Sequence, residues 1–177
     1  MTDDEGRCQN CSDYLKHRVH LRKQRLVKAW LDGHDRLRSY EYYDRPVEGG
    51  ICGKERPDFV WDTPTHKVVL EVDEHQHQTY TPECEKARME KVTYSLGLPC
   101  LWVRFNPDEF QGPRSSTIKE RERRDLLLRV LEDALRDVPT QESEVVRVRY
   151  LFYDGFRLGQ PVSTEVLPVT WTSLMNL

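Results

Sequence analysis

The chain has 177 residues, of which 32% are charged and 37% hydrophobic, so it is long and apolar enough for one domain with its own core. It contains no run of about eighteen apolar residues and no signal-peptide pattern, and we therefore expect neither a membrane span nor Sec export. Its five cysteines are odd in number and irregularly spaced, which favours a reducing compartment, cytoplasm or nucleus, over a disulfide framework.

Residues 1–12 are polar and contain the motif Cys8-x2-Cys11, which supplies half of a tetrahedral zinc site. His17 and His20 follow, but their spacing is not that of a standard zinc finger. Three interpretations stay open: a zinc site, a flexible tail with two free thiols, or a motif whose other ligands lay upstream in a longer precursor. We predict a flexible tail that carries a partial zinc motif.

The first predicted helix begins at Ser12 or Asp13 and runs to about Leu31, with Gly33 as its stop. Residues 14–30 contain no acid, and six basic side chains cover the polar faces of this helix: Lys16, Arg18, Arg22, Lys23, Arg25 and Lys28. Such a surface is either a solvated helix face or a binding site for phosphates. As candidates for nucleic-acid binding we take Arg18, Arg22, Lys23 and Arg25.

The stretch Arg56–His77 predicts two short strands joined by a turn at Thr63–Thr65, after a short strand at 39–43 and a loop at 45–53. Because side chains alternate along a strand, Glu71 and Asp73 point the same way, and the hairpin partner can bring Asp58 to that side. Converging carboxylates in an apolar hairpin are costly unless a positive group lies among them. A divalent cation is the natural candidate.

The second half of the chain predicts a helix at 82–96, closed by Gly97, and a buried strand at 100–105. A helix at 117–137 and a strand at 145–153 follow, and residues 161–169 can pair with that strand. We expect the last eight residues to be loosely attached, and we interpret the lone His34 and His66 as surface residues. The order predicts an α/β fold with a mixed central sheet flanked by helices. The predicted domain spans residues 13–160, and residues 161–177 form a C-terminal strand and tail.

Taken together, these residues resemble the PD-(D/E)XK nuclease superfamily, and most closely its very-short-patch-repair-like endonuclease domains. The resemblance rests on Arg56-Pro57-Asp58-Phe59 before the hairpin, on Glu71-Val72-Asp73, and on His77, which follows Asp73 as in the family pattern E-x-D-G-x-x-H. Arg88 on a helix and the later Val103-Arg104-Phe105-Asn106 continue it. Similar domains occur in proteins of large DNA viruses and algae, where zinc-binding modules precede them.

This resemblance implies a restriction-endonuclease-like core and metal-dependent hydrolysis of phosphodiester bonds in DNA. It implies Mg²⁺, or Mn²⁺, held by Asp58, Glu71 and Asp73. His75 or His77 would orient or deprotonate the attacking water, and Lys86 or Arg88 would stabilise developing negative charge. The implied catalytic set is Asp58, Glu71, Asp73, His77, Lys86 and Arg88. The zinc-binding modules of the similar proteins would also account for the partial motif at Cys8 and Cys11, where Zn²⁺ stays one of the open interpretations.

The chain departs from the family pattern at three positions. Asp73 stands where the superfamily usually has lysine, Gln24 lies where relatives often carry glutamate, and Glu74 replaces a glycine. Two rival hypotheses therefore stay open. One is a catalytically degenerate nucleic-acid-binding module of the same fold. The other is a regulatory or scaffold domain in which Cys8 and Cys11 form a zinc-bridged interface. Taken singly, Asp58 can also be a strand-end hydrogen-bond acceptor, and Glu71 a buried partner of Arg88 or Arg104.

Overall fold

The computed structural model describes residues 13–47, 56–77 and 81–175, and of residues 13–21 and 77 it describes the backbone alone. The strands are β1 (Tyr42–Tyr43), β2 (Phe59–Asp62), β3 (Lys67–Val72), β4 (Cys100–Phe105), β5 (Val146–Leu151) and β6 (Glu165–Val166). The α-helices are α1 (Asp13–Asp32), α2 (Pro82–Leu96), α3 (Glu120–Arg136) and α4 (Trp171–Leu174), and two short 3₁₀ segments are η1 (Glu74–His77) and η2 (Ser115–Thr117).

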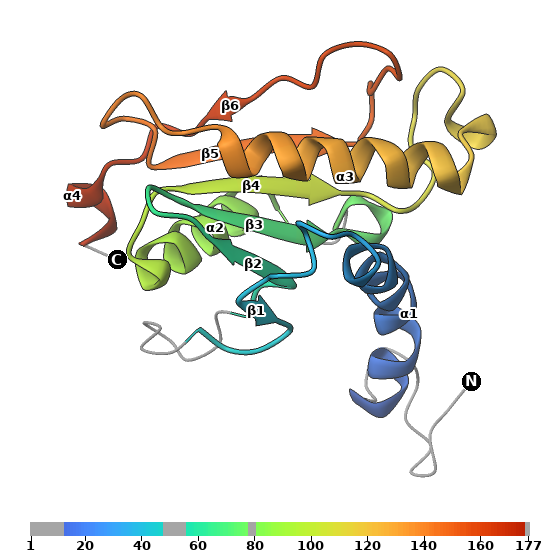
Figure 1. Cartoon of the computed structure of the whole chain (residues 1–177), viewed down its shortest axis with the longest axis horizontal. Coiled ribbons are helices and arrows are strands. Elements are labelled where there is room, and N and C mark those ends of the chain that lie inside the picture. Colours follow the sequence, from blue (N-terminus) through green and yellow to red (C-terminus); the bar gives the residue numbers. More distant parts are fainter. Residues whose placement is uncertain (1–12, 48–55, 78–80, 176–177) are drawn as a thin grey trace.

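The six strands form one mixed open sheet in the order β1-β2-β3-β4-β5-β6 (Figure 1). Strands β1, β2 and β3 form an antiparallel meander, β3, β4 and β5 run parallel, and β6 returns antiparallel to β5. Parallel neighbours need crossover connections, and α2 and α3 provide them. The carboxyl ends of β3, β4 and β5 consequently meet at one edge of the sheet, where open α/β sheets usually bind ligands.

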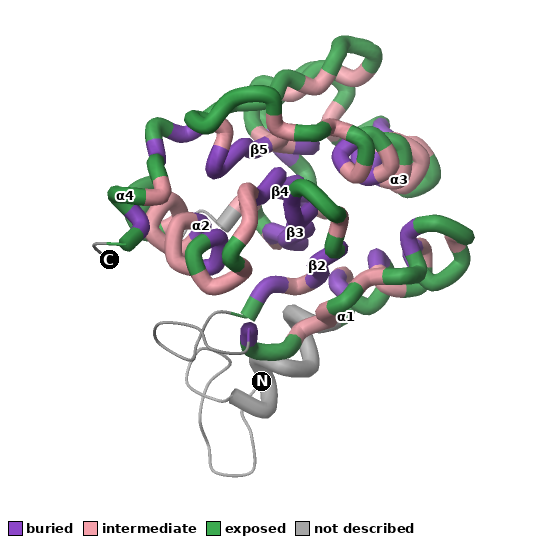
Figure 2. The backbone as a smooth tube through the Cα atoms, turned by 60° about the vertical axis from the view of Figure 1, so that its left-hand side comes forward, coloured by how far each residue is buried: buried purple, intermediate pink, exposed green. Residues whose placement is uncertain are grey.

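Helices cover both faces of this sheet. Figure 2 shows the buried strands between α2 on one side and α1 and α3 on the other. Leu31 of α1 and Leu127 of α3 pack in the larger apolar cluster, whereas Met89 of α2 packs in the second cluster. Because both faces are covered, every residue of β3 and β4 is buried, and these strands read as nearly continuous apolar runs. The predicted α/β class with a mixed, helix-flanked sheet is confirmed.

Local sequence signals explain the best-predicted element, α2. The hydroxyl group of Thr81 accepts a hydrogen bond from the backbone N–H of Cys84, and Pro82 occupies the first turn of the helix. Gly97 ends the helix in the left-handed conformation, at a φ of 71°, and its N–H bonds the last carbonyl groups. The predicted bounds of α2 and of β4 are confirmed. Strand β1 is shorter than predicted, since only Tyr42–Tyr43 pair with β2.

Two expectations are wrong. Most of the C-terminal segment is attached, because Thr170 caps α4 and Leu174, only 1% exposed, packs in the α2-side cluster. His66 is buried, and its Nε2 lies 2.9 Å from the carbonyl oxygen of Ala134. The turn around it is polar on the surface but folds back beneath α3. The motif Cys8-x2-Cys11, the tail at 1–12 and most of the loop predicted at 45–53 lie outside the described residues.

Candidate functional site

A row of polar side chains crosses the sheet next to the last buried apolar row, at the carboxyl ends of the parallel strands. The strand register extends to place Asp58 opposite Glu71, pairs Glu71 with Arg104, and pairs Arg104 with Tyr150. Side chains two residues apart share a face, so this row lies on the face that packs against α2. The neighbouring row on that face, Val60, Val69, Trp102 and Val148, is buried. The polar row therefore stands at the carboxyl edge of the sheet, between the core and the exit loops.

Asp58 and Glu71 form the first cluster, which we call the acidic pair. Oδ2 of Asp58 accepts a hydrogen bond from the backbone N–H of Val72 at 2.7 Å, and Oδ1 accepts one from Nε2 of Gln24 at 2.8 Å. Oε1 of Glu71 lies 2.7 Å from Nη2 of Arg88 on α2. The acidic pair thus joins the β2–β3 hairpin to α1 on one side and to α2 on the other.

The charges of the acidic pair are incompletely balanced. Burial raises the pKa of Asp58 well above its ordinary value, and the nearby charge of Glu71 raises it further. Burial also raises the pKa of Glu71, against the lowering effect of Arg88. The guanidinium group of Arg88, in turn, has a raised pKa, chiefly because of Glu71. Among the described residues, the cation that contacts the pair is Arg88, through Glu71, and the pair resists full ionisation.

Asp73 belongs to a second cluster one strand further along, which we call the Arg104 cluster. Its carboxylate accepts hydrogen bonds from Nε of Arg104 and from the hydroxyl group of Tyr153, and Nη2 of Arg104 also contacts the carboxylate of Glu85. Asp73 is fully buried and Arg104 is 2% exposed. Burial opposes the charge of Arg104, but the contact with Asp73 raises the pKa of its guanidinium group overall. This cluster has a buried cation at its centre.

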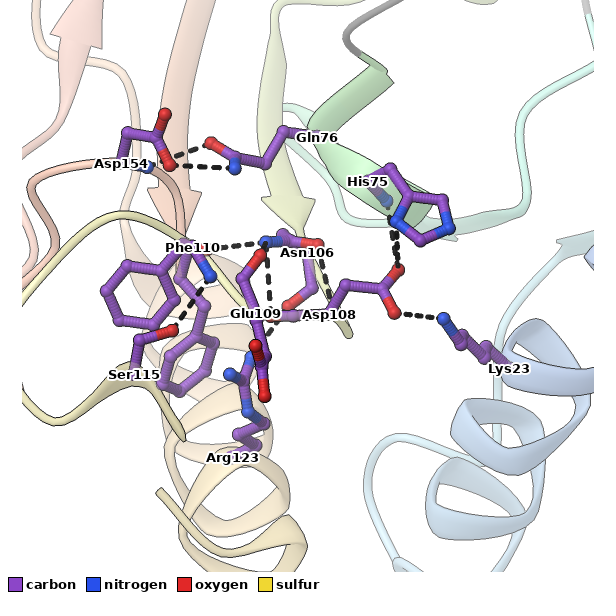
Figure 3. Close-up of polar contacts among 11 residues, drawn as sticks. Lys23, His75, Gln76, Asn106, Asp108, Glu109, Phe110, Ser115, Arg123 and Asp154 are labelled. Atoms are coloured by element: carbon purple, nitrogen blue, oxygen red, sulfur yellow. Dashed lines mark hydrogen bonds and ion pairs between the residues drawn. The ribbon is translucent and has the colours of Figure 1, made fainter. Parts of the chain in front are cut away.

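The exit from β3 is a strained turn that Asp108 holds in place (Figure 3). His75 and Gln76 have positive φ angles of 54° and 57°, a conformation that side chains other than glycine rarely adopt. Oδ2 of Asp108 accepts the backbone N–H of His75 at 2.9 Å, and Oδ1 pairs with Nζ of Lys23 on α1. Burial raises the pKa of Asp108, but the contacts with Lys23 and with the backbone N–H of His75 outweigh this effect and lower the pKa overall. Two hydrogen bonds join the Gln76 side chain to Asp154.

The predicted site residues therefore separate into groups. Asp58, Glu71 and Arg88 lie together, whereas Asp73 is engaged in the Arg104 cluster. Lys86, two positions before Arg88 on α2, lines a neighbouring pocket, and its Nζ lies 3.7 Å from Oε1 of Glu90. His75 is largely exposed beside Asp108, while the side chain of His77 lies outside the described part of the chain. Among the residues described, no group of three or more His, Cys, Asp or Glu is arranged to hold a metal ion.

The basic face of α1 is only partly available. Arg22 and Arg25 are exposed, Lys23 is paired with Asp108, and the side chain of Arg18 is outside the described part. Sequence reasoning missed Asp108, Glu85 and Tyr153. Asp108 and Tyr153 each follow the carboxyl end of a parallel strand. Because ligands usually bind beyond those ends, their position in the sequence could have identified them as candidates. Glu85 carried no such signal, because a glutamate in the first turn of a helix is ordinary.

Comparison of the chain with protein-family models, curated proteins and solved structures finds no match. None of the described helices is both long enough and apolar enough to cross a membrane.

Proposed function

We propose that the protein is a Mg²⁺-dependent endonuclease-like domain that hydrolyses phosphodiester bonds of DNA. The observation that carries the proposal is the acidic pair: two carboxylates on opposed strands, at the carboxyl edge of the sheet, whose pKa values are raised by burial. Placing two carboxylates there costs folding free energy, and a bound dication would recover it. Sites of chemistry commonly contain such perturbed groups.

The donor set fits a hard divalent cation. Carboxylate oxygens are the ligands that Mg²⁺ prefers, and it keeps several of its waters when bound. A carboxylate has about four lone-pair positions, and the two hydrogen bonds to Asp58 leave capacity for a further ligand. Asp58 and Glu71 would hold the ion, and Asp73 stays a predicted ligand that would have to leave Arg104. When bound, the ion would polarise the phosphate and lower the pKa of a coordinated water.

The residues around the acidic pair have roles that follow from their contacts. Gln24 holds Asp58 and so fixes α1, with its exposed Arg22 and Arg25, beside the pair. Those side chains would attract the DNA backbone. Arg88, which contacts Glu71, would contact the non-bridging phosphate oxygens and stabilise the charge that develops on them. His75, exposed at the same edge, and His77 are the candidates for moving the proton of the attacking water.

The resemblance to very-short-patch-repair-like domains supports the same proposal. Two of the residues on which it rests, Asp58 and Glu71, are the two carboxylates of the acidic pair. A restriction-endonuclease-like core is the finer fold assignment that goes with it. The crossover from β3 through α2 to the parallel strand β4 brings Arg88 of α2 into contact with Glu71 of β3. Asp58, Glu71 and Arg88, which come from three separate segments of the sequence, therefore lie at one edge of the sheet.

A catalytically degenerate nucleic-acid-binding module is the second candidate, and one observation favours it. Arg88 and Gln24 already occupy an oxygen of Glu71 and one of Asp58. A neutral amide and a fixed arginine can replace a metal ion as partners of these carboxylates. Such a protein would bind DNA in a salt-dependent manner and would cleave none.

Incubation of the purified protein with supercoiled plasmid and Mg²⁺ or Mn²⁺ tests the first candidate. We expect metal-dependent nicking or linearisation that falls by at least about 100-fold in Asp58→Asn and Glu71→Gln, since even residues that only support a metal ligand contribute about 10–100-fold. Asp133→Asn, which changes an exposed carboxylate on α3, is the matched control and should cleave like the wild type.

Metal binding should also be visible without turnover. Mg²⁺ is expected to raise the unfolding temperature of the wild type and of Asp133→Asn, but not that of Asp58→Asn, because a ligand stabilises the state that binds it. If plasmid remains intact with every metal while DNA binding persists, the degenerate module is the better description. Loss of both cleavage and binding would refute the two candidates together.

A further inference from the structure

A pocket of about 360 Å³ opens beside the Arg104 cluster, on the side of the sheet that faces α2. Met89 of α2 and Leu167, both buried, supply apolar wall, and Tyr150 and Tyr153 at the end of β5 supply aromatic wall. The two tyrosine rings meet edge to face, with centroids 5.0 Å apart at an interplanar angle of 68°. The volume lies in the range of sites for small molecules. The pocket is therefore large enough for one flat ring system.

The charges of the pocket point to a neutral occupant. Two acids and two bases are among its described lining residues, namely Glu85, Glu165, Lys86 and Arg104, so their formal charges cancel. Arg104 and Glu85 contact one another. A phosphate group would gain little from this lining, whereas a neutral ring that can both stack and hydrogen-bond would gain from the tyrosines and from the polar rim.

The position of the pocket relates it to the acidic pair. Tyr150 on β5 is in register with Arg104 on β4, which is in register with Glu71 on β3. Neighbouring strands are about 4.8 Å apart, so Tyr150 lies about 10 Å from Glu71 along the polar row. That separation suits a nucleotide next to one whose phosphate lies at the acidic pair. Lys86 at the rim is placed to meet the backbone of the same strand.

We infer that this pocket receives a single unpaired nucleobase of the nucleic acid whose backbone binds at the acidic pair, an inference that rests on the proposed function. The base stacks on Tyr150, and the apolar surfaces of Met89 and Leu167 exclude water from its other face. Arg104, held by Asp73 and Glu85, keeps the pocket open and rigid. The preferred substrate is then DNA with an unpaired or easily unpaired base, since unstacking a paired base costs free energy.

Binding of two short duplexes in EDTA tests this inference. One carries 2-aminopurine opposite an abasic position, and the other carries the same 2-aminopurine fully paired. We expect the wild type to prefer the unpaired base by about 5- to 150-fold, the range that stacking of one base contributes, and to quench its fluorescence. Tyr150→Leu should lose the preference and the quenching, whereas Tyr150→Phe, which keeps the ring, should retain both. Thermal unfolding checks that each variant is folded.

The outcomes separate this inference from the proposed function. Equal affinity for the two duplexes, or a preference that survives in Tyr150→Leu, overturns the pocket assignment even if plasmid is cleaved. A preference that depends on Tyr150 in a protein that never cleaves DNA upholds the pocket and rejects catalysis. Asp133→Asn, an exposed change on α3, should keep the preference, because it leaves the pocket lining unchanged. Absence of binding to either duplex overturns the pocket assignment, whereas the plasmid assay with Mg²⁺ or Mn²⁺ decides the proposed function separately.

Discussion

The acidic pair and the Arg104 cluster occupy adjacent positions at one edge of the same sheet, yet their charges are balanced differently. In the Arg104 cluster a guanidinium group that is almost fully buried lies between Asp73 and Glu85, and Tyr153 donates to Asp73 as well. In the acidic pair, the cation in contact among the described residues is Arg88, whose side chain is 35% exposed and whose guanidinium group contacts Glu71. Each cluster thus combines two carboxylates with one guanidinium group. They differ in that Arg104 is buried and contacts both of its acids, whereas the side chain of Arg88 is partly solvated and contacts Glu71.

This difference indicates where a ligand is expected to bind. A buried charge network rigidifies its surroundings, and removing one member leaves the others uncompensated. A pair of carboxylates with raised pKa values has free energy to gain from a cation or from protonation. We therefore interpret the Arg104 cluster as the support that positions the edge of the sheet, and the acidic pair as the part that reacts to metal and pH.

The largest expected effect is on the Arg104 cluster. Arg104→Leu would leave the carboxylate of Asp73 buried without its guanidinium partner, and we expect the free energy of unfolding to fall by about 3–5 kcal/mol. Urea denaturation measures this change. Arg88→Leu is the matched substitution at the acidic pair and should cost clearly less, because Arg88 is partly solvated. Equal losses for the two variants would remove the distinction between the clusters.

A smaller effect is expected from the hydroxyl group of Tyr153. Tyr153→Phe removes its hydrogen bond to Asp73 and should lower the free energy of unfolding by about 1.5–3 kcal/mol, the usual range for a hydrogen bond to a charged group. Tyr150→Phe removes a hydroxyl group from the neighbouring ring without changing the contact at Asp73. Chemical denaturation of the two variants side by side should show a loss in Tyr153→Phe alone.

The acidic pair should respond in the opposite direction. In the absence of metal, Asp58→Asn removes one of two repelling charges. Its amide oxygen can still accept from Val72, and its NH2 group can donate to Gln24 once the Gln24 amide turns over, so we expect a gain of about 1–2 kcal/mol at neutral pH. Added Mg²⁺ should reduce the gain, since only the wild type would bind it. A clear loss of stability in Asp58→Asn, measured by urea denaturation in EDTA, would mean that the pair is already compensated.

Sequence patterns predicted the elements that carry this edge of the sheet, and they did so for local reasons. Pro82 and Gly97 mark the two ends of α2, and Thr63 to Thr65 lie in the turn between β2 and β3. The unbroken apolar run of β4 identifies a strand that is covered on both faces. The proximity of Asp58 to Glu71 also followed from strand alternation, and Gln24 does reach Asp58 from the first helix.

The partners of the charges did not follow from the sequence, because they depend on tertiary contacts. Alternation along β3 placed Asp73 on the side of Glu71, but Tyr153 comes from a segment 80 residues away and Glu85 from the first turn of α2. Arg104 lies within an apolar run, and nothing local shows which acid it pairs with. His66 was placed at the surface for the same reason: its turn is polar, and only the packing of α3 above it buries the ring.

The smallest expected effect is the pH dependence of the gain in Asp58→Asn. The folded-state pKa of Asp58 is raised by burial and by Glu71, so its contribution to stability is fully present below the unfolded pKa of about 4 and is lost as pH rises through the folded value. Wild type and Asp58→Asn should therefore have nearly equal unfolding free energies near pH 4, and the variant should become the more stable as pH increases toward neutrality. Urea midpoints measured across this range in EDTA give the difference directly. A difference that stays constant with pH would show that the pKa of Asp58 is the same in the folded and unfolded states, as it would be if Arg88 offset the effects of burial and of Glu71.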